Sequence, residues 1–217
     1  MDNRSCVIEF TGTAGSGKSY LKNAVEIKLE SSEITVEEPS ISVADFSQKS
    51  TWCVILNTLK LIFYIKPKSF TGAIKSFYFF LRAQLLIKKT RENGGVLLLS
   101  EGFVHKTRLL RKSSRYHFML KHLDTAFLNK FYFPDLVVLV TAKATDINKR
   151  LKNRDNVIKN KTDEGITKSL EPTLSDINAL ADVQLYTYNN SSTTPIEIKK
   201  EQQSEIVFIV KEVLDDA

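Results

Sequence analysis

The residues with the clearest chemistry lie near the N-terminus, in a string that fits the pattern G-x-x-x-x-G-K-[ST] at every fixed position. The string is Gly12, Thr13, Ala14, Gly15, Ser16, Gly17, Lys18 and Ser19. Glycines let the backbone turn so that successive N–H groups point at phosphate oxygens. A lysine at this position reaches the β- and γ-phosphates of a nucleotide, and the serine hydroxyl after it can ligate Mg²⁺. The string therefore predicts a nucleotide-binding loop, with Lys18 catalytic and Ser19 a metal ligand.

The segments on either side of this string have the patterns that a phosphate-binding loop needs. Residues 6–10 are a short apolar run, typical of a buried strand, and residues 18–29 carry apolar side chains at helical spacing. A helix that begins near Lys18 would add its positive N-terminal end to the site. A glycine-rich turn with an incidental lysine would not require this context, so we interpret the string as a strand–loop–helix phosphate site.

Strand-like and helical segments alternate along the rest of the chain. Strand-like runs lie at 34–37, 94–102, 134–142, 183–188 and 195–198. Helical patterns cover 52–91, broken by Pro67 and Gly72, and then 106–130, 146–153 and 201–214. The polar residues 154–168 are expected to form a mobile loop. This alternation predicts an α/β fold with a mostly parallel sheet in a single domain.

Composition restricts the protein to a soluble globular class. The chain has 217 residues, 42% of them hydrophobic, and a net charge of +6, which favours an anionic partner. The first ten residues lack the pattern of a signal peptide, and the longest apolar stretches, 51–65 and 73–87, are shorter than a membrane span. The two cysteines form no disulfide framework and indicate a reducing compartment. We therefore expect a cytoplasmic protein.

Three further stretches resemble motifs of the thymidylate kinase and deoxynucleoside kinase group of P-loop kinases. "VEEPS" at 36–40 resembles the Glu-Pro dipeptide that ends the second strand, and residues 79–102 resemble the R-x-Q helix that precedes the third strand. Residues 134–154 resemble the fourth strand and a helix whose arginines lie four apart at the lid. The resemblance implies a three-layer α/β/α P-loop fold with a mostly parallel five-stranded sheet. It also implies a helical insertion at about 46–93 that holds the acceptor site, and a lid at about 154–168.

The resemblance also implies roles for residues outside the loop. Glu38 would face the acceptor, and Arg82 would hold it. Arg150 and Arg154 would clamp the transferred phosphoryl group, since phosphoryl transfer depends mainly on positioning and charge neutralisation. Glu101 would position Mg²⁺ or act as a base. Alternatives stay open for three of these interpretations: a strand-end position for Glu38, a structural carboxylate partner for Arg82, and a solvated basic face for the two later arginines.

Two features depart from these families. The third strand ends in Ser100-Glu101-Gly102, where thymidylate kinases have D-R and deoxynucleoside kinases have E-R, so the arginine is missing. Several basic residues follow and could replace it, or could form a basic helix surface: Lys106, Arg108, Arg111, Lys112 and Arg115. Residues 46–81 are unusually aromatic, which is compatible with core, an apolar acceptor pocket or an interface between subunits.

The sequence therefore predicts an ATP- and Mg²⁺-dependent kinase, similar to nucleoside and nucleotide kinases, that phosphorylates a small molecule. A nucleotide-binding regulatory module with little kinase activity and a kinase of a lipid or glycan precursor at the membrane surface are the alternatives. The expected partners are ATP and a small acceptor, and neither nucleic acid nor an integral membrane location is expected. Peripheral membrane association and a homodimer stay open. The residues do not specify the acceptor, ATP over GTP, or the oligomeric state.

Overall fold

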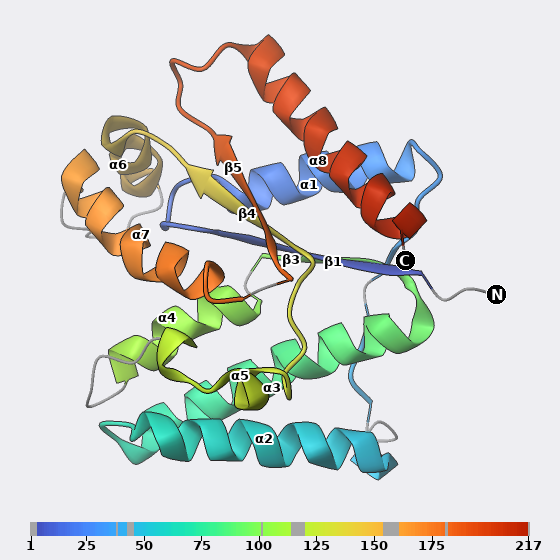
Figure 1. Cartoon of the computed structure of the whole chain (residues 1–217). Coiled ribbons are helices and arrows are strands. Elements are labelled where there is room, and N and C mark those ends of the chain that lie inside the picture. The colour runs from blue at the N-terminus through green and yellow to red at the C-terminus, as the bar shows by residue number, and fades with distance from the viewer. Residues whose placement is uncertain are drawn as a thin grey trace.

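The computed structural model describes residues 4–37, 39–42, 46–100, 102–113, 120–153, 161–180 and 182–216. In this part of the chain a five-stranded sheet in the order β2-β3-β1-β4-β5 lies between layers of helices (Figure 1). The strands are β1 (Ser5–Gly12), β2 (Val36–Glu37), β3 (Gly95–Leu99), β4 (Leu136–Thr141) and β5 (Gln184–Asn189). Every neighbouring pair is parallel. The predicted three-layer α/β/α fold with a parallel five-stranded sheet is confirmed.

The central strands are buried because helices cover both of their faces. All eight residues of β1 are buried, and so are the first five of β4, which explains why β4 is a continuous apolar run and β1 is mostly apolar. Successive side chains point to opposite faces. Val7 and Val137 pack into the core on one side of the sheet, and Ile8 and Val138 pack into the core on the other side.

One helical layer consists of α1 (Lys18–Glu30) and α8 (Ile196–Asp216), which contact each other. The layer on the other side contains α2 (Lys49–Ile65), α3 (Phe70–Asn93), α4 (Phe103–Ser113), the 3₁₀ turn η2 (Leu120–His122) and α5 (Thr125–Leu128) (Figure 1). Helices α6 (Ala144–Lys152) and α7 (Asp163–Ile177) enclose a smaller apolar cluster at the carboxyl end of β4. No helix in the described ranges is long and apolar enough to cross a membrane.

Four of the predicted segments are wrong, and each error has a local cause. The helix predicted at 106–130 does not continue through 120–130, where the structure has η2 and then α5, whose start the Asp124 side chain caps by accepting from the Ala126 N–H (3.2 Å). Gly72 does not break a helix, because the Ser69 hydroxyl caps α3 by accepting a hydrogen bond from the Gly72 N–H (3.1 Å). Residues 195–198 are not a strand but the start of α8, where Pro195 suits a helix N-terminus. The mobile loop predicted at 154–168 ends before α7 begins at Asp163, because the Thr162 hydroxyl caps this helix by accepting a hydrogen bond from the Gly165 N–H (3.1 Å). Residues 154–160 lie outside the described residues.

A buried ion pair ties α7 to α4 and η2. The Asp176 carboxylate accepts hydrogen bonds from the Arg111 guanidinium (2.6 Å), the Thr107 hydroxyl (3.1 Å) and the Leu120 N–H (2.7 Å). The Asp176 side chain is fully buried and that of Arg111 is 8% exposed. Arg111 was a candidate to replace the missing arginine, but this pairing gives it a structural role.

We expect Asp176→Ala to lower the free energy of unfolding by about 3–5 kcal/mol, because it leaves a buried guanidinium without its counter-ion. The exposed pair between Glu164 and Lys168 on the same helix provides a matched control. There, Lys168→Ala should change stability by less than about 1 kcal/mol. Urea denaturation of both variants measures the two changes in the free energy of unfolding. Equal changes would contradict the claim that the buried pair contributes more stability than the exposed pair.

Candidate functional site

The predicted phosphate loop connects β1 to α1 in a conformation that depends on glycine. The φ angles of Gly12, Gly15 and Gly17 are 147°, 84° and 103°, in the region that other residues rarely adopt. A Cβ atom at Gly12 would lie 2.3 Å from the Val140 carbonyl oxygen, and one at Gly17 would lie 1.9 Å from Nδ2 of Asn190. Helix α1 begins at the next residue, so its positive end faces the space in front of the loop.

Side chains from other elements hold three consecutive carbonyl groups of this loop, those of residues 14–16. Lys161 Nζ donates to the Ala14 carbonyl (3.3 Å), and Arg150 Nη1 donates to the carbonyls of Gly15 and Ser16 (3.2 and 3.0 Å). Asn190 Nδ2 also donates to the Ser16 carbonyl (2.8 Å), and the main-chain carbonyl of Asn190 accepts from Arg150 Nη2 (2.7 Å). The loop is therefore fixed from outside by α6, the residue after β5 and the segment before α7.

The side chains of the loop itself fit a phosphate group and Mg²⁺. The Lys18 ammonium bends back over the loop and donates to the carbonyls of Gly12 and Thr13 (3.3 and 3.2 Å). The Ser16 hydroxyl is buried and has no hydrogen-bond partner within the described residues. Ser19 is exposed in the first turn of α1. Mg²⁺ is often bound by few protein ligands together with substrate phosphates, so the Ser19 hydroxyl is a suitable ligand.

A cleft of about 890 Å³ opens in front of the loop. It is lined by the loop and α1 (Ala14, Gly15, Gly17, Lys18, Ser19, Tyr20), by Ser100, Arg150, Asn153 and Asn190, and by the start of α8 (Ile196, Lys199, Lys200, Gln203). Lysine and arginine side chains supply the charge of this lining, and no carboxylate belongs to it among the described residues. Such a surface suits an anionic ligand.

The structure brings some of the predicted site residues together and leaves others apart. Arg150 lines the cleft beside the loop, as the motif suggested, although its hydrogen bonds in this structure go to the main chain. Arg82 is exposed on α3 and does not belong to the lining. It is therefore not the buried arginine that its apolar surroundings in the sequence suggested. Glu38, Glu101 and Arg154 lie outside the described residues, and their roles stay predictions.

Sequence reasoning missed several residues of the cleft. Asn190 directly follows β5 and Ser100 directly follows β3, so both lie where the carboxyl ends of parallel strands meet. A polar residue immediately after a buried strand was the signal that could have identified them. The lining from α8 could not be recognised, because Pro195–Ile198 alternates like a strand and its helical register was not predicted.

Behind the loop, β1 carries a buried carboxylate, Glu9. It accepts hydrogen bonds from the N–H groups of Val104 (2.9 Å) and His105 (2.6 Å) at the start of α4. A Cβ at Gly102 would lie 2.5 Å from this carboxylate, which explains the glycine that follows β3. Complete burial raises the pKa of Glu9 to about 7, even though the helix amides and the Lys106 charge lower it.

The raised pKa of Glu9 predicts a pH-dependent stability. The folded chain binds this proton more tightly than the unfolded chain, whose pKa is near 4.5. The resulting stabilisation is complete below pH 4.5 and is lost as the pH rises through about 7. Between these values the free energy of unfolding should fall by on the order of 3 kcal/mol from this group alone.

Glu9→Gln should remove this part of the pH dependence, because the amide does not titrate. Chemical denaturation of the native chain and the variant between pH 4.5 and 7 measures the effect. Glu171→Gln, an exposed glutamate on α7, is the control and should leave the profile unchanged. If the free energy of unfolding fell as steeply with pH in Glu9→Gln as in the native chain, the raised pKa of Glu9 would be refuted.

No family model and no curated protein matches the sequence. Solved structures do match. Two of them are deoxyadenosine kinase from M. mycoides, one with dCMP and dCDP bound and one with dATP bound, each with a TM-score of 0.50. The first is 14% identical and covers 95% of this chain and 99% of that one; the second is 13% identical and covers 94% and 99%. At this identity the comparison establishes the fold alone: the chain has the same fold as deoxyadenosine kinase.

Proposed function

We propose that this chain is an ATP- and Mg²⁺-dependent kinase that transfers the γ-phosphoryl group to a small acceptor of the nucleoside or nucleotide class. The observation that carries the proposal is the loop at residues 12–19, with its left-handed glycines and the Lys18 ammonium above it at one end of a positively charged cleft. The fold shared with deoxyadenosine kinase supports a nucleotide-related acceptor.

The fixed carbonyl groups of the loop support phosphate binding through peptide geometry. In a trans peptide the C=O of one residue and the N–H of the next point in opposite directions. Because the carbonyls of residues 14 and 16 are held by Lys161, Arg150 and Asn190, the N–H groups of Gly15 and Gly17 point away from those side chains. These amides would bind the phosphate oxygens of the donor.

Lys18, Ser19 and Arg150 would divide the remaining work. Lys18 would move its ammonium from the loop carbonyls to the β- and γ-phosphates, where it neutralises charge during transfer. Ser19 would hold Mg²⁺, which would supply positive charge to neutralise the phosphates of the donor. Arg150 would keep the loop in shape through its three main-chain hydrogen bonds, in addition to the clamp role that the motif implies.

The order of the strands separates a donor side from an acceptor side. The cleft lining contributed by the start of α8 and by Asn190 lies on the β4–β5 side of the loop, and would take the nucleoside part of the donor. Strands β2 and β3 lie on the other side of β1. The residues that follow them, Glu38 and Glu101, would face the acceptor there, next to Ser100 at the edge of the cleft.

The test is ATP consumption with and without a panel of nucleosides, nucleotides and sugars. We expect one class of acceptor to stimulate turnover, and Lys18→Ala to reduce that turnover by roughly 10²–10³-fold, the range seen when one group that stabilises transition-state charge is removed. Lys22→Ala, on the same helix but outside the cleft, should leave it unchanged. Tight ADP binding without acceptor-stimulated turnover would instead support a regulatory module.

A second variant tests whether the loop must be held from outside. Asn190→Ala removes the hydrogen bond to the Ser16 carbonyl, and we expect it to weaken ADP binding roughly tenfold, as the loss of about 1.4 kcal/mol would. Thr187→Ala, at another exposed position on β5, is the control. Isothermal titration calorimetry measures both affinities. Equal affinities in the two variants would show that Asn190 does not act on the loop.

A further inference from the structure

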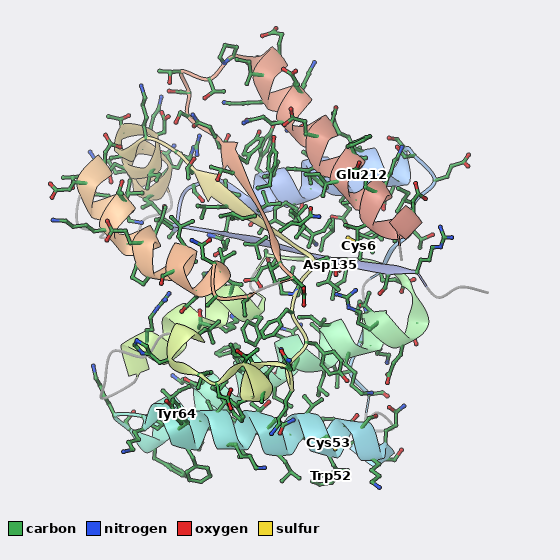
Figure 2. All side chains as sticks on the ribbon, viewed as in Figure 1. Cys6, Trp52, Cys53, Tyr64, Asp135 and Glu212 are labelled. Carbon is green, nitrogen blue, oxygen red and sulfur yellow. The ribbon has the colours of Figure 1, made fainter. Side chains whose placement is uncertain are left out.

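The outer face of α2 is apolar although no part of the described chain covers it. Trp52, Leu56, Leu59 and Phe63 recur at helical spacing and are 53%, 53%, 37% and 79% exposed. Helix α2 packs on α3 and is the outermost helix of its layer, on the opposite side of the sheet from α8 (Figure 1). Figure 2 labels Trp52 on the side of α2 that points away from the sheet.

Large apolar side chains are also exposed next to the turn between α2 and α3 and on α3. Phe63 and Phe70 stand at the two ends of the turn and, at 79% and 80%, are the most exposed large apolar side chains among the described residues. Lys66, Pro67 and Lys68 lie between them. Ile74 and Tyr78 then extend the exposed apolar surface along the first half of α3. A group of exposed apolar side chains on two helices that pack together indicates an interaction site.

The charge of the same segment has a single sign. Residues 49–82 contain six of the 31 lysines and arginines and none of the 25 aspartates and glutamates. Their formal charge is +6, as large as that of the whole chain. The basic side chains exposed on the two helices and their turn are Lys49, Lys60, Lys66, Lys68, Lys75 and Arg82. A partner for this face must therefore be anionic and must accept apolar side chains.

We propose that the α2–α3 face, meaning the exposed side chains of residues 49–82, binds to the surface of an anionic lipid bilayer. Phe63 and Phe70 would enter the headgroup region, the stripe on α2 would lie along it, and the lysines would contact lipid phosphates. A second copy of the same face fits less well, because lysines would meet lysines with no carboxylate between them. The aliphatic Leu56, Leu59 and Ile74 give no advantage on a nucleic-acid backbone, but they suit an acyl layer.

This placement keeps the candidate site accessible. The cleft is lined in part by α8, which lies on the far side of the sheet from α2 (Figure 1). A chain bound through α2 and α3 would therefore keep the start of α8 in water. The inference stands apart from the kinase proposal, because it rests on a different surface and requires no nucleotide.

Co-sedimentation of the full chain with vesicles tests the inference. We expect binding to vesicles that contain phosphatidylglycerol, little binding to pure phosphatidylcholine, and weaker binding as salt is raised. The double variants Phe63→Ser/Phe70→Ser and Lys66→Glu/Lys68→Glu should each reduce the partition coefficient at least ~10-fold, since both apolar insertion and charge contribute. Phe208→Ser, which removes a 60% exposed phenylalanine from α8, is the matched control and should bind as the native chain does.

Thermal unfolding of each variant verifies that these exposed substitutions leave the fold intact. The inference is overturned if anionic vesicles do not bind the chain, or if both double variants bind them as well as the native chain. It is also overturned if sedimentation velocity shows a dimer that Phe63→Ser/Phe70→Ser dissociates while vesicles are not bound. Binding of a single-stranded oligonucleotide in place of vesicles would overturn it in the same way.

Discussion

The direction of three peptide groups in the phosphate loop is the constraint on which the rest of the site depends. A loop that offers its N–H groups to an anion must turn its carbonyl groups outward, where they need donors of their own. Arg150, Asn190 and Lys161 supply those donors. Glycines permit the turn, but these external side chains select one conformation from the many that glycine allows.

This requirement accounts for much of the architecture around the loop. Strand β5 ends where Asn190 can reach the Ser16 carbonyl, and α6 presents Arg150 to the same peptide groups. Gly15 packs against α6 so closely that a Cβ atom would lie 3.0 Å from Leu151 Cγ. The Glu9 carboxylate of β1 fixes the start of α4, the helix that follows β3 in the chain. Elements that do not contact the loop, chiefly α2, can use their exposed surfaces for other interactions.

The features of the fold that local sequence patterns encode could be predicted from the sequence. The features that depend on tertiary contacts could not. The loop with the strand before it and the helix after it, the parallel sheet and the helix at 201–214 follow from spacing and periodicity. The start of α7 and of α8 was missed because short polar or alternating runs take their structure from caps and neighbours. Arg111 shows the same limit for function: its position after the third strand suggested a replacement for the missing arginine, and only the fold pairs it with Asp176.

The hydrogen bonds that hold the loop join residues that are far apart in the sequence. Arg150 reaches the loop across 134 and 135 positions of sequence, Lys161 across 147 and Asn190 across 174. Bringing such distant residues together costs the conformational entropy of closing long segments of chain. The hydrogen-bonded form of the loop therefore exists only when α6 and β5 are in place. A ligand of this loop recognises the completed fold and adds its binding free energy to the stability of the whole domain.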